Sequence, residues 1–570
     1  MKNNKYILLM ILSLIFVTGC DKLLDKDPYV DFTDPSFWSS ETNVETYCNK
    51  YYDEWLGYGN GNGQGAYYYQ TLNDNQASSG FSEFTKNIPA SNGTWSSSYI
   101  EIRRANLAIE RIPGISSMNE AAKNHWIGVS RLYRALQHYS IVRELGDCIW
   151  VDKYLSDSKE DKEAFLYSTR TDRDVVMDNI LEDLNFAVSN ISKNGSSRTA
   201  LNVSVAQAIK AEICLYEGTF SKYRSAQDGQ KAADASRAEK YLKECKTACE
   251  AIMNNGSFAL NSDYQANYNS LDLNGNKEMI MYKKYLYGVL AHSLIDYTCS
   301  STMMHGMSKA AFDSYLFKDG LPLALTAENT TDHGVLVGEG DAARYSIKNL
   351  LSVRDPRLSA CVDTTLCYRG KGYTRFGVGM VQTSSTGYGV YKFDNANIEV
   401  NHRNQGNSNE TDAPLYTLAE IYLSYAEACA ELGECSQAVL DNTINKLRDR
   451  VGMPHLAVAP QHDPANNMGV SDLLWEIRRE RRIEMMYDKN DRYWSLIRWH
   501  QLDKLDNVNY PDQTRGAWVG TVVGEASVDS EGYIDCAKGQ QRRYDAKYYL
   551  QPIPSGQLDL NKDLGQNYGW

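Results

Sequence analysis

The chain lacks the short motifs by which many enzymes hold a metal, a nucleotide or a nucleophile. No H-E-x-x-H, C-x-x-C, G-x-S-x-G or Walker sequence occurs in its 570 residues, and its nine histidines show no metal-ligand spacing. The glycine-rich run 57–65 has no following Lys-Ser/Thr, so it indicates a flexible loop and not a phosphate site. We therefore predict no catalytic residue, no metal site and no cofactor. A glycosidase pair can be neither identified nor excluded among 72 acidic residues.

Positively charged residues are outnumbered, with 59 lysines and arginines against 72 aspartates and glutamates. The formal net charge is −13, and it becomes −15 once residues 1–19, which carry only Lys2 and Lys5 as charged residues, are removed. Such an acidic chain repels phosphate backbones and anionic lipid surfaces. Nucleic acid is thus excluded as a predicted partner.

Long apolar runs are missing after residue 20, and a membrane-spanning helix needs about 20 apolar residues. The first twenty residues have a basic start, an apolar run at 7–17 and the ending Val17-Thr18-Gly19-Cys20. This order is typical of a secretory signal, and its end resembles a lipobox. The resemblance implies a signal peptide at 1–19 and acyl chains such as palmitate on Cys20. Residues 20–35 are rich in charge and show little periodicity, which indicates a tether between the membrane and the body of the protein. An ordinary secreted protein remains the alternative.

A cysteine framework is also absent. Of twelve cysteines, one is the predicted lipid site, and the eleven others are scattered. An odd number without regular spacing argues against a disulfide scaffold. Single bridges such as Cys361 to Cys367 or Cys429 to Cys435 stay open, because spacing alone cannot assign them.

Helical periodicity dominates what is present. Apolar residues recur at three- and four-residue spacing in ten segments, and glycine or asparagine stop signals follow many of them. The segments are 41–56, 95–112, 119–145, 172–192, 203–218, 236–254, 416–433, 436–450, 471–487 and 491–502. The sequence therefore predicts a mainly α protein.

Two pairs of these helices are similar to tetratricopeptide units. Small residues such as Ala419, Ala426 and Ala430 alternate with large ones in 416–433, and a second helix follows at 436–450. The helices 203–218 and 236–254 repeat this arrangement. Small residues let paired helices approach closely, and such pairs bury their apolar faces by stacking. A plain helical bundle is the alternative.

Long irregular inserts separate the helices at 57–94, 257–415 and 503–548. They are far longer than ordinary connections and rich in tyrosine, of which the chain has 40, with 10 tryptophans against 13 phenylalanines. Tyrosine and tryptophan combine an apolar face with a polar group, which suits half-wet surfaces. The length and aromatic content of these inserts therefore predict ordered binding loops on a rigid helical scaffold.

The run Arg478-Arg-Glu-Arg-Arg482 looks basic in isolation. Glu476, Glu480 and Glu484 interleave with it at four-residue spacing, which offers ion pairs along a helix surface. We predict a structural role for this run.

Several segments in a fixed order behind the lipobox resemble the SusD/RagB family of surface lipoproteins. They span nearly the whole mature chain and are Trp95-x3-Tyr99 with Ile102-Arg-Arg-Ala-Asn106, Arg131-x2-Arg134-Ala135 to Leu145-Gly146-Asp147, Asp355-Pro-Arg-Leu358, the 415–431 helix, Glu480-Arg-Arg482 to Trp499, Tyr548-Tyr-Leu-Gln-Pro-Ile-Pro554 and Gln566-Asn-Tyr-Gly-Trp570. Cys148-Ile149, Asp488-Lys-Asn490 and Tyr568 depart from the family's pattern at turns.

The resemblance implies one compact SusD-like body, with tetratricopeptide-like helix pairs and long loop inserts, divided into an N-terminal region at 36–260 and a C-terminal region at 261–570. It implies a lipid-anchored protein of the outer membrane, facing outward, that binds a glycan and delivers it to a SusC-like TonB-dependent transporter without breaking a bond. A RagB-like peptide-binding lipoprotein and a surface glycoside hydrolase are the alternatives.

The predicted ligand site lies in the loop after the first helix, joined by the segment near 282–287. Family members that resemble this chain tend to use this loop, and it places amphipathic rings near hydrogen-bonding side chains, which is the combination that a sugar requires. The predicted ligand-binding residues are Tyr67, Tyr68, Tyr69, Asn73, Asp74, Asn75, Trp95, Tyr285 and Tyr287. The alternative is that these tyrosines pin a long loop to the helices.

Overall fold

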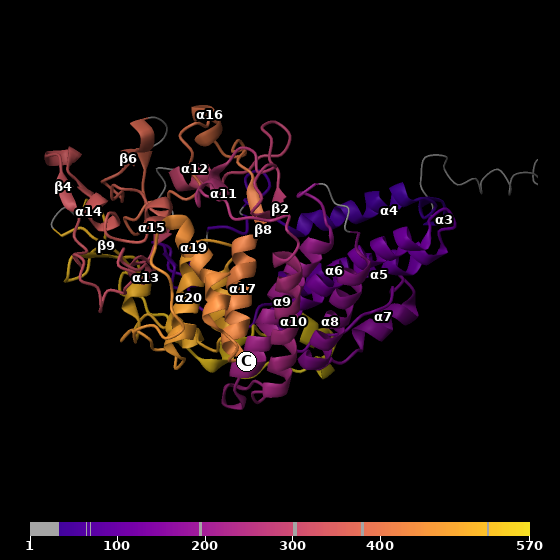
Figure 1. The fold of residues 1–570 in the computed structure, drawn as a ribbon. Coiled ribbons are helices and arrows are strands. Elements are labelled where there is room, and N and C mark those ends of the chain that lie inside the picture. The colour runs from indigo at the N-terminus through magenta and orange to yellow at the C-terminus, as the bar shows by residue number, and fades with distance from the viewer. Residues whose placement is uncertain are drawn as a thin grey trace, which may run out of the picture.

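The structure is a computed structural model that describes residues 34–63, 65–68, 70–192, 197–299, 305–377, 381–520 and 524–570. The predicted signal peptide, Cys20 and nearly all of the predicted tether lie outside these residues. Helices and strands keep the labels of Figure 1 throughout.

The helices carry most of the regular structure. They are α3 (Asp34–Phe37), α4 (Glu41–Cys48), α5 (Gly93–Arg111), α6 (Glu120–Leu145), α7 (Lys159–Leu166), α8 (Arg173–Asn190), α9 (Val203–Tyr223), α10 (Ala235–Met253), α11 (Ala266–Asn269), α12 (Leu294–Cys299), α13 (Lys309–Ser314), α14 (Lys348–Leu351), α15 (Pro356–Cys361), α16 (Val400–Arg403), α17 (Leu418–Glu431), α18 (Gln437–Asp441), α19 (Ile444–Val451), α20 (Asp472–Glu484), α21 (Asp491–Arg498) and α22 (Ser555–Leu560).

The strands are short and pair only in twos among the described residues. The antiparallel pairs are β1 (Gln76–Ala77) with β3 (Gly306–Met307), β2 (Met279–Lys283) with β8 (Ala413–Thr417), β4 (Val335–Val337) with β5 (Arg344–Ser346), β6 (Tyr373–Thr374) with β7 (Val381–Gln382), and β9 (Arg515–Trp518) with β10 (Tyr533–Asp535). The predicted mainly α class is confirmed.

All ten segments predicted as helices contain α-helix. Segment 41–56 is α4 followed by a 3₁₀ turn, and segment 436–450 is broken into α18 and α19. Helix α7 was not predicted, because none of its residues is buried and an apolar stripe is therefore not required. Within the described residues, none of the helices has the length and apolarity to cross a membrane.

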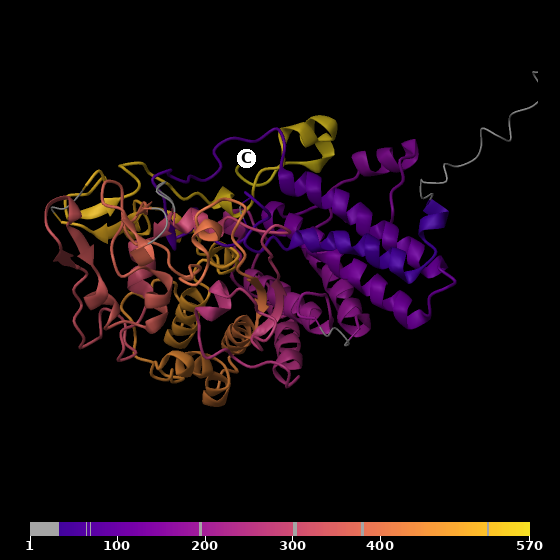
Figure 2. The ribbon, with the colours of Figure 1, turned by 90° about the horizontal axis from the view of Figure 1, so that it is seen from above.

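The long helices stack in sequence order from α5 to α10, and α17 then packs on α10 and α20 on α17. The close approach of α9 and α10 depends on Gly218, where a Cβ atom would come within 2.8 Å of Leu242. Figure 1 shows this helical stack on one side and the irregular loops with the small sheets on the other. The view from above in Figure 2 shows the same division.

Two buried clusters fill the interior. The larger one runs from Trp38 to Leu564 and joins the helical stack to the C-terminal segments. The smaller one lies under the loops and is rich in tyrosine, including Tyr58, Tyr264 and Tyr315. The long inserts are thus ordered by aromatic packing of their own.

The run 478–482 does not lie on a helix surface, so that part of its prediction is wrong. Arg478, Arg479 and Arg481 are buried in α20. Their partners include carboxylates on other elements, such as Glu427 and Glu431 of α17. The ion pairs therefore connect helices, because charge spacing along one helix does not tell which neighbours cover it.

The ten cysteines whose side chains the structure describes are free thiols. They include both pairs whose bridging the spacing left open.

Candidate functional site

The two segments predicted to share the ligand site lie against each other. The Tyr285 hydroxyl accepts a hydrogen bond from the Tyr58 N–H (3.0 Å) and donates one to the Gly59 carbonyl (2.7 Å). The Lys283 ammonium donates to the Asn60 side-chain oxygen (2.7 Å). The loop after the first helix is therefore fixed to the chain around Tyr285.

Most of the predicted ligand-binding rings are buried in this contact. Tyr67 is 2% exposed and Tyr68 is 1% exposed. The Tyr67 hydroxyl donates to the Pro414 carbonyl, and the Tyr68 hydroxyl donates to the His305 carbonyl at 2.6 Å. Neither ring has a face open to solvent, so a sugar could stack on it only after this packing opened. Tyr69 lies outside the described residues.

The polar residues predicted beside these rings have partners within the protein. The Asn73 side-chain oxygen accepts the Asn75 N–H at 2.8 Å, and the Asn75 side-chain oxygen accepts from Arg482 at 2.8 Å. Asp74 accepts two hydrogen bonds of 2.7 Å from Arg492. Burial raises the pKa of Asp74, but the charges of Arg482 and Arg492 outweigh it and hold this pKa well below its ordinary value.

Trp95 lies in α5, where its ring contacts Tyr99 edge-on at 5.2 Å inside the helical core. Tyr285 is also buried. Tyr287 differs from both because its ring is 49% exposed. Among the predicted rings that the structure describes, Tyr287 alone combines an open face with a place at the loop surface.

The Tyr287 ring stacks on His402 of α16, with centroids 3.8 Å apart and planes 13° from parallel. His402 is held in turn by Glu410, whose carboxylate lies 2.9 Å from the ring nitrogen Nδ1. Tyr287 stands on a tight turn with Leu286 and Val289, which are 55% and 80% exposed. A flat aromatic pair with an apolar border is the kind of surface on which the C–H face of a sugar packs.

A second exposed ring contacts the next residue of α16. Phe376 is 43% exposed, and the Arg403 guanidinium lies 5.3 Å from its ring centre. Its φ of +59° is rare for a bulky residue, and such strain tends to persist where surrounding structure or function requires it. We call Tyr287, His402 and Phe376, together with Leu286 and Val289, the loop platform.

Three loops meet under the platform. The Ser293 hydroxyl donates to the Gly61 carbonyl (2.9 Å) and accepts the Asn407 N–H (2.8 Å). The Asn409 amide nitrogen donates to the His402 carbonyl (2.6 Å). These bonds tie the loops at 57–63, 286–297 and 400–410 into one unit, which pre-organises the rings that they carry.

One polar side chain next to α16 has an unused hydrogen-bond acceptor. The side-chain oxygen of Asn404, next to α16, is buried and has no hydrogen-bond partner among the described residues. Such an acceptor suits a hydroxyl group or a bridging water. The arrangement offers stacking and hydrogen bonds.

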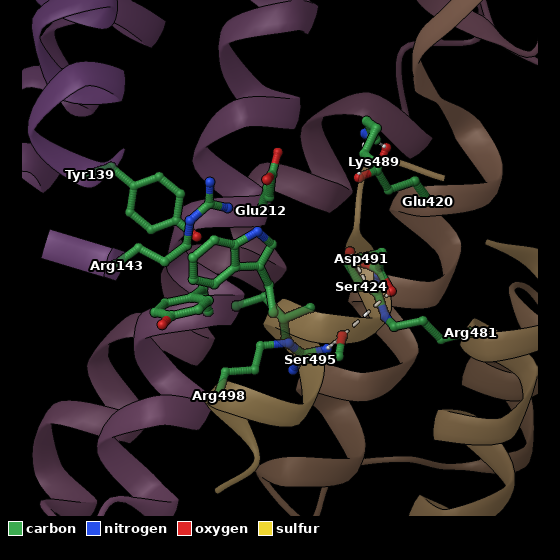
Figure 3. A pocket seen from close by; sticks show the side chains of 13 residues that line it. Tyr139, Arg143, Glu212, Glu420, Ser424, Arg481, Lys489, Asp491, Ser495 and Arg498 are labelled. Atoms are coloured by element: carbon green, nitrogen blue, oxygen red, sulfur yellow. Dashed lines mark hydrogen bonds and ion pairs between the residues drawn. The ribbon is translucent and has the colours of Figure 1, made fainter. Parts of the chain in front are cut away.

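A charged cavity lies between the long helices. Figure 3 shows Arg143, Glu212, Lys489 and Arg498 among the side chains around it. Its volume of about 50 Å³ leaves room for one or two waters, since a water occupies about 30 Å³. A sugar ring does not fit there.

Two larger hollows open on the helical side. One, of about 440 Å³, lies between α5 and α7 and is mainly apolar. The other, of about 470 Å³, is bordered by Trp494, Tyr549 and the loop residues Leu72 and Asn92. None of the nine predicted ligand-binding residues lines this second hollow. The loop platform is therefore where a predicted residue and an open aromatic face coincide.

Sequence reasoning missed His402 and Phe376. His402 comes 115 positions after Tyr287, and local sequence carries no sign that the two rings stack. The positive φ of Phe376 follows from its place before Gly377 in a tight turn, which only the folded chain reveals. Within the described residues no group of three or more His, Cys, Asp or Glu side chains could hold a metal ion.

Comparison with known families gives two matches. The model of the SusD family matches residues 249–570, and a model described as starch-binding, associating with the outer membrane, matches residues 22–215. A SusD-like protein of Bacteroides ovatus is 23% identical over 545 residues, covering 91% of this chain and 87% of the relative. SusD-like protein P38 of Formosa agariphila is 21% identical over 536 residues, covering 91% and 95%.

Solved structures share the fold. A SusD-like carbohydrate-binding protein of Bacteroides fragilis superposes with a TM-score of 0.69 at 22% identity, covering 93% of this chain and all of that one. A crystal structure with xylogluco-oligosaccharide gives a TM-score of 0.57 at 18% identity, covering 92% and 98%. At these identities the likeness shows the fold, and the choice of ligand has to be argued from this chain's own surface.

Proposed function

This chain belongs to the SusD family, and we propose that it captures an oligosaccharide at the loop platform and passes it to a SusC-like TonB-dependent transporter. The observation that carries the proposal is the stack of Tyr287 on His402, an open aromatic face on an ordered loop surface. The xylogluco-oligosaccharide in a structural relative supports a glycan as the ligand class. Capture needs no bond cleavage, so we propose a binding protein and not an enzyme.

Replacing Tyr287 by Ala is expected to weaken oligosaccharide binding about tenfold or more. Removal of one stacking ring costs about 1 to 2 kcal/mol, which corresponds to that factor. Stability should change little, because the ring is half exposed. Calorimetric titration against a panel of glycans first identifies the ligand, and the variant is then titrated with it.

Tyr167→Ala is the matched control, because Tyr167 is 65% exposed after α7, on the helical side. It should bind like the parent. Equal affinity of the Tyr287 variant would remove the platform from the site. Binding of peptides in place of glycans would favour the RagB-like alternative, and release of shorter sugars on incubation would favour a hydrolase.

Delivery to a transporter requires a lasting contact at the outer membrane. Exposed apolar residues gather on the loop side, among them Leu286, Val289 and the whole of β4. Exposed apolar patches of this kind mark interaction surfaces. We propose that this side faces the transporter and that a lipid on Cys20 holds the protein to the outer leaflet, facing outward.

Cys20→Ala is expected to leave the protein soluble or retained as precursor, and to reduce its co-purification with the transporter. Two or more acyl chains give stable anchorage, and without them only the protein contact remains. Mild-detergent extraction of cells grown on the inducing nutrient, followed by mass spectrometry, measures both effects. An unmodified Cys20 in membrane-bound protein, or the repeated absence of a TonB-dependent partner, would contradict the proposal.

A further inference from the structure

A further pocket lies between α13 and α20. Figure 1 shows these two helices well below α16. Its volume of about 180 Å³ equals the share of about six waters. Its lining residues are Ala310, Asp313, Ser314, Ala465, Met468, Trp475, Arg478, Arg479, Arg482 and Arg492. Four arginines and one acidic residue, Asp313, thus line the pocket.

Two of these arginines share a single carboxylate. Arg492 makes two hydrogen bonds of 2.7 Å to Asp74, and Arg482 lies 3.3 Å from the same carboxylate. One negative charge therefore compensates two positive charges on this wall. An anion in the pocket would supply the missing charge.

The other two arginines have donors left over. The Nε atoms of Arg478 and Arg479 are buried and have no hydrogen-bond partner among the described residues. Arg478 pairs with Glu431 at 3.0 Å, but Glu431 also pairs with Lys222 at 2.8 Å. Arg479 pairs with Asp463 and, at 3.2 Å, with Glu476, so its charge is compensated and only its Nε lacks an acceptor. Buried donors without acceptors are rare, so each calls for an acceptor that the chain itself does not provide.

The surroundings of Arg482 disfavour the charged form of its guanidinium group. Burial lowers the pKa of Arg482 to about 10, and the neighbouring charges of Arg492 and Arg479 act in the same direction. Asp74 opposes the change without cancelling it. The excess positive charge of the wall is therefore that of Arg482 and Arg492, which share the Asp74 carboxylate.

Asp313 reduces the surplus only in part. It pairs with Lys309 and lies 3.8 Å from Arg354, so its charge is already used by two cations. Trp475 and Met468 also line the pocket. They lie beside the arginines, because the Arg479 guanidinium is 5.5 Å from the Trp475 ring centre and Arg478 donates to the Met468 sulfur at 3.8 Å. A ligand in the pocket therefore meets arginine side chains together with apolar ones.

We propose that this pocket binds a small oxyanion group, a sulfate or a carboxylate, either as a free ion or as a substituent of an acidic sugar. Guanidinium groups recognise such anions through paired, charge-assisted hydrogen bonds. The site is separate from the loop platform and does not depend on the function proposed for it.

Calorimetric titration of the mature protein with sodium sulfate, at constant ionic strength against a chloride reference, is the test. We expect saturable binding of sulfate, no binding of glucose, and binding of glucuronate if the pocket serves acidic sugars. Glucuronate tighter than sulfate identifies the sugar as the source, and sulfate alone identifies the free ion. Absence of saturable binding for both anions would overturn the proposal.

Two variants assign the binding to the pocket. Arg482→Gln removes one of the two positive charges at Asp74, while Arg492 keeps both of its hydrogen bonds. Ala465→Phe adds an aromatic ring at an exposed residue that lines the pocket, and it removes no charged side chain. Each should weaken sulfate binding about tenfold or more.

Ala457→Phe, at an exposed position of the same loop but outside the pocket lining, is the matched control and should bind sulfate like the parent. Tyr287→Ala should also leave sulfate binding unchanged, which keeps this test independent of the glycan test. Unaltered affinity in both pocket variants would overturn the proposal.

Discussion

Replacing Asp74 by Asn is expected to lower the free energy of unfolding by about 3 to 5 kcal/mol. Removing one partner of a buried ion pair leaves an uncompensated buried charge, and that penalty has this size. Here one carboxylate serves two guanidinium groups, Arg482 and Arg492, and its side chain is only 10% exposed. Asparagine keeps the shape of the side chain but removes the charge.

Urea unfolding at neutral pH measures the change, with Asp157→Asn as the matched control. The Asp157 side chain is 84% exposed and lies 3.4 Å from Arg103, so its replacement should cost well under about 1 kcal/mol. If Asp74→Asn instead left stability unchanged and weakened glycan binding, Asp74 would belong to the ligand site, as the sequence alone suggests, and not to the scaffold.

The contrast at Asp74 shows what a sequence can and cannot tell. The run at 67–76 displays three tyrosines beside four hydrogen-bonding side chains, and that composition suits a sugar site. Whether those groups face solvent depends on distant partners. The Tyr67 hydroxyl reaches the Pro414 carbonyl 347 positions later, and Asp74 reaches Arg492 after 418 positions. The prediction of these residues as ligand-binding remains a prediction.

The helices could be predicted because their signal is local. In α6 and α10 the spacing of apolar residues along the chain defines the buried stripe, and asparagine or aspartate caps mark the starts. The run 478–482 shows the limit of that logic. Its alternating charges correctly indicated ion pairs, but burial between α17 and α21 is a property of the stack and not of the helix.

The candidate site contains one residue that the sequence indicated and others that only the packing of the chain reveals. Segment 282–287 was predicted to join the site, and Tyr287 indeed lies on the exposed surface. Its stacking partner His402 comes from a four-residue helix inside a long irregular insert, where neither periodicity nor spacing gives a signal. The platform is a product of loop packing, so sequence reasoning could find one ring of it and not the surface.

Replacing Glu427 by Gln is the second change for which we expect an effect of about 3 to 5 kcal/mol, because it removes a buried charge at a junction of three helices. The Glu427 carboxylate in α17 accepts hydrogen bonds from Arg498 at 2.5 and 2.8 Å, from Arg481 at 3.2 Å and from the Trp499 indole at 2.6 Å. Glutamine preserves the packing but removes the counter-charge of Arg498 and leaves Arg481 with Asp491 as its ion-pair partner. Glu239→Gln, at an exposed pair with Lys243, is the matched control and should cost about 0.5 kcal/mol or less.

The pH dependence of this difference provides a sharper test. Burial raises the pKa of Glu427, but the charges of Arg498, Arg481 and Arg478 outweigh it and lower the pKa to about 2. A carboxyl group whose pKa is depressed in the folded state stabilises the protein above its unfolded pKa of about 4.3, and this contribution is lost as the pH falls toward the folded pKa. The stability gap between the parent and Glu427→Gln should therefore be constant above about pH 5 and shrink by roughly 2 kcal/mol by pH 3. Urea titrations of both proteins at several pH values measure the gap, and a gap that stays constant down to pH 3 would show that Glu427 does not carry the charge that holds α17, α20 and α21 together.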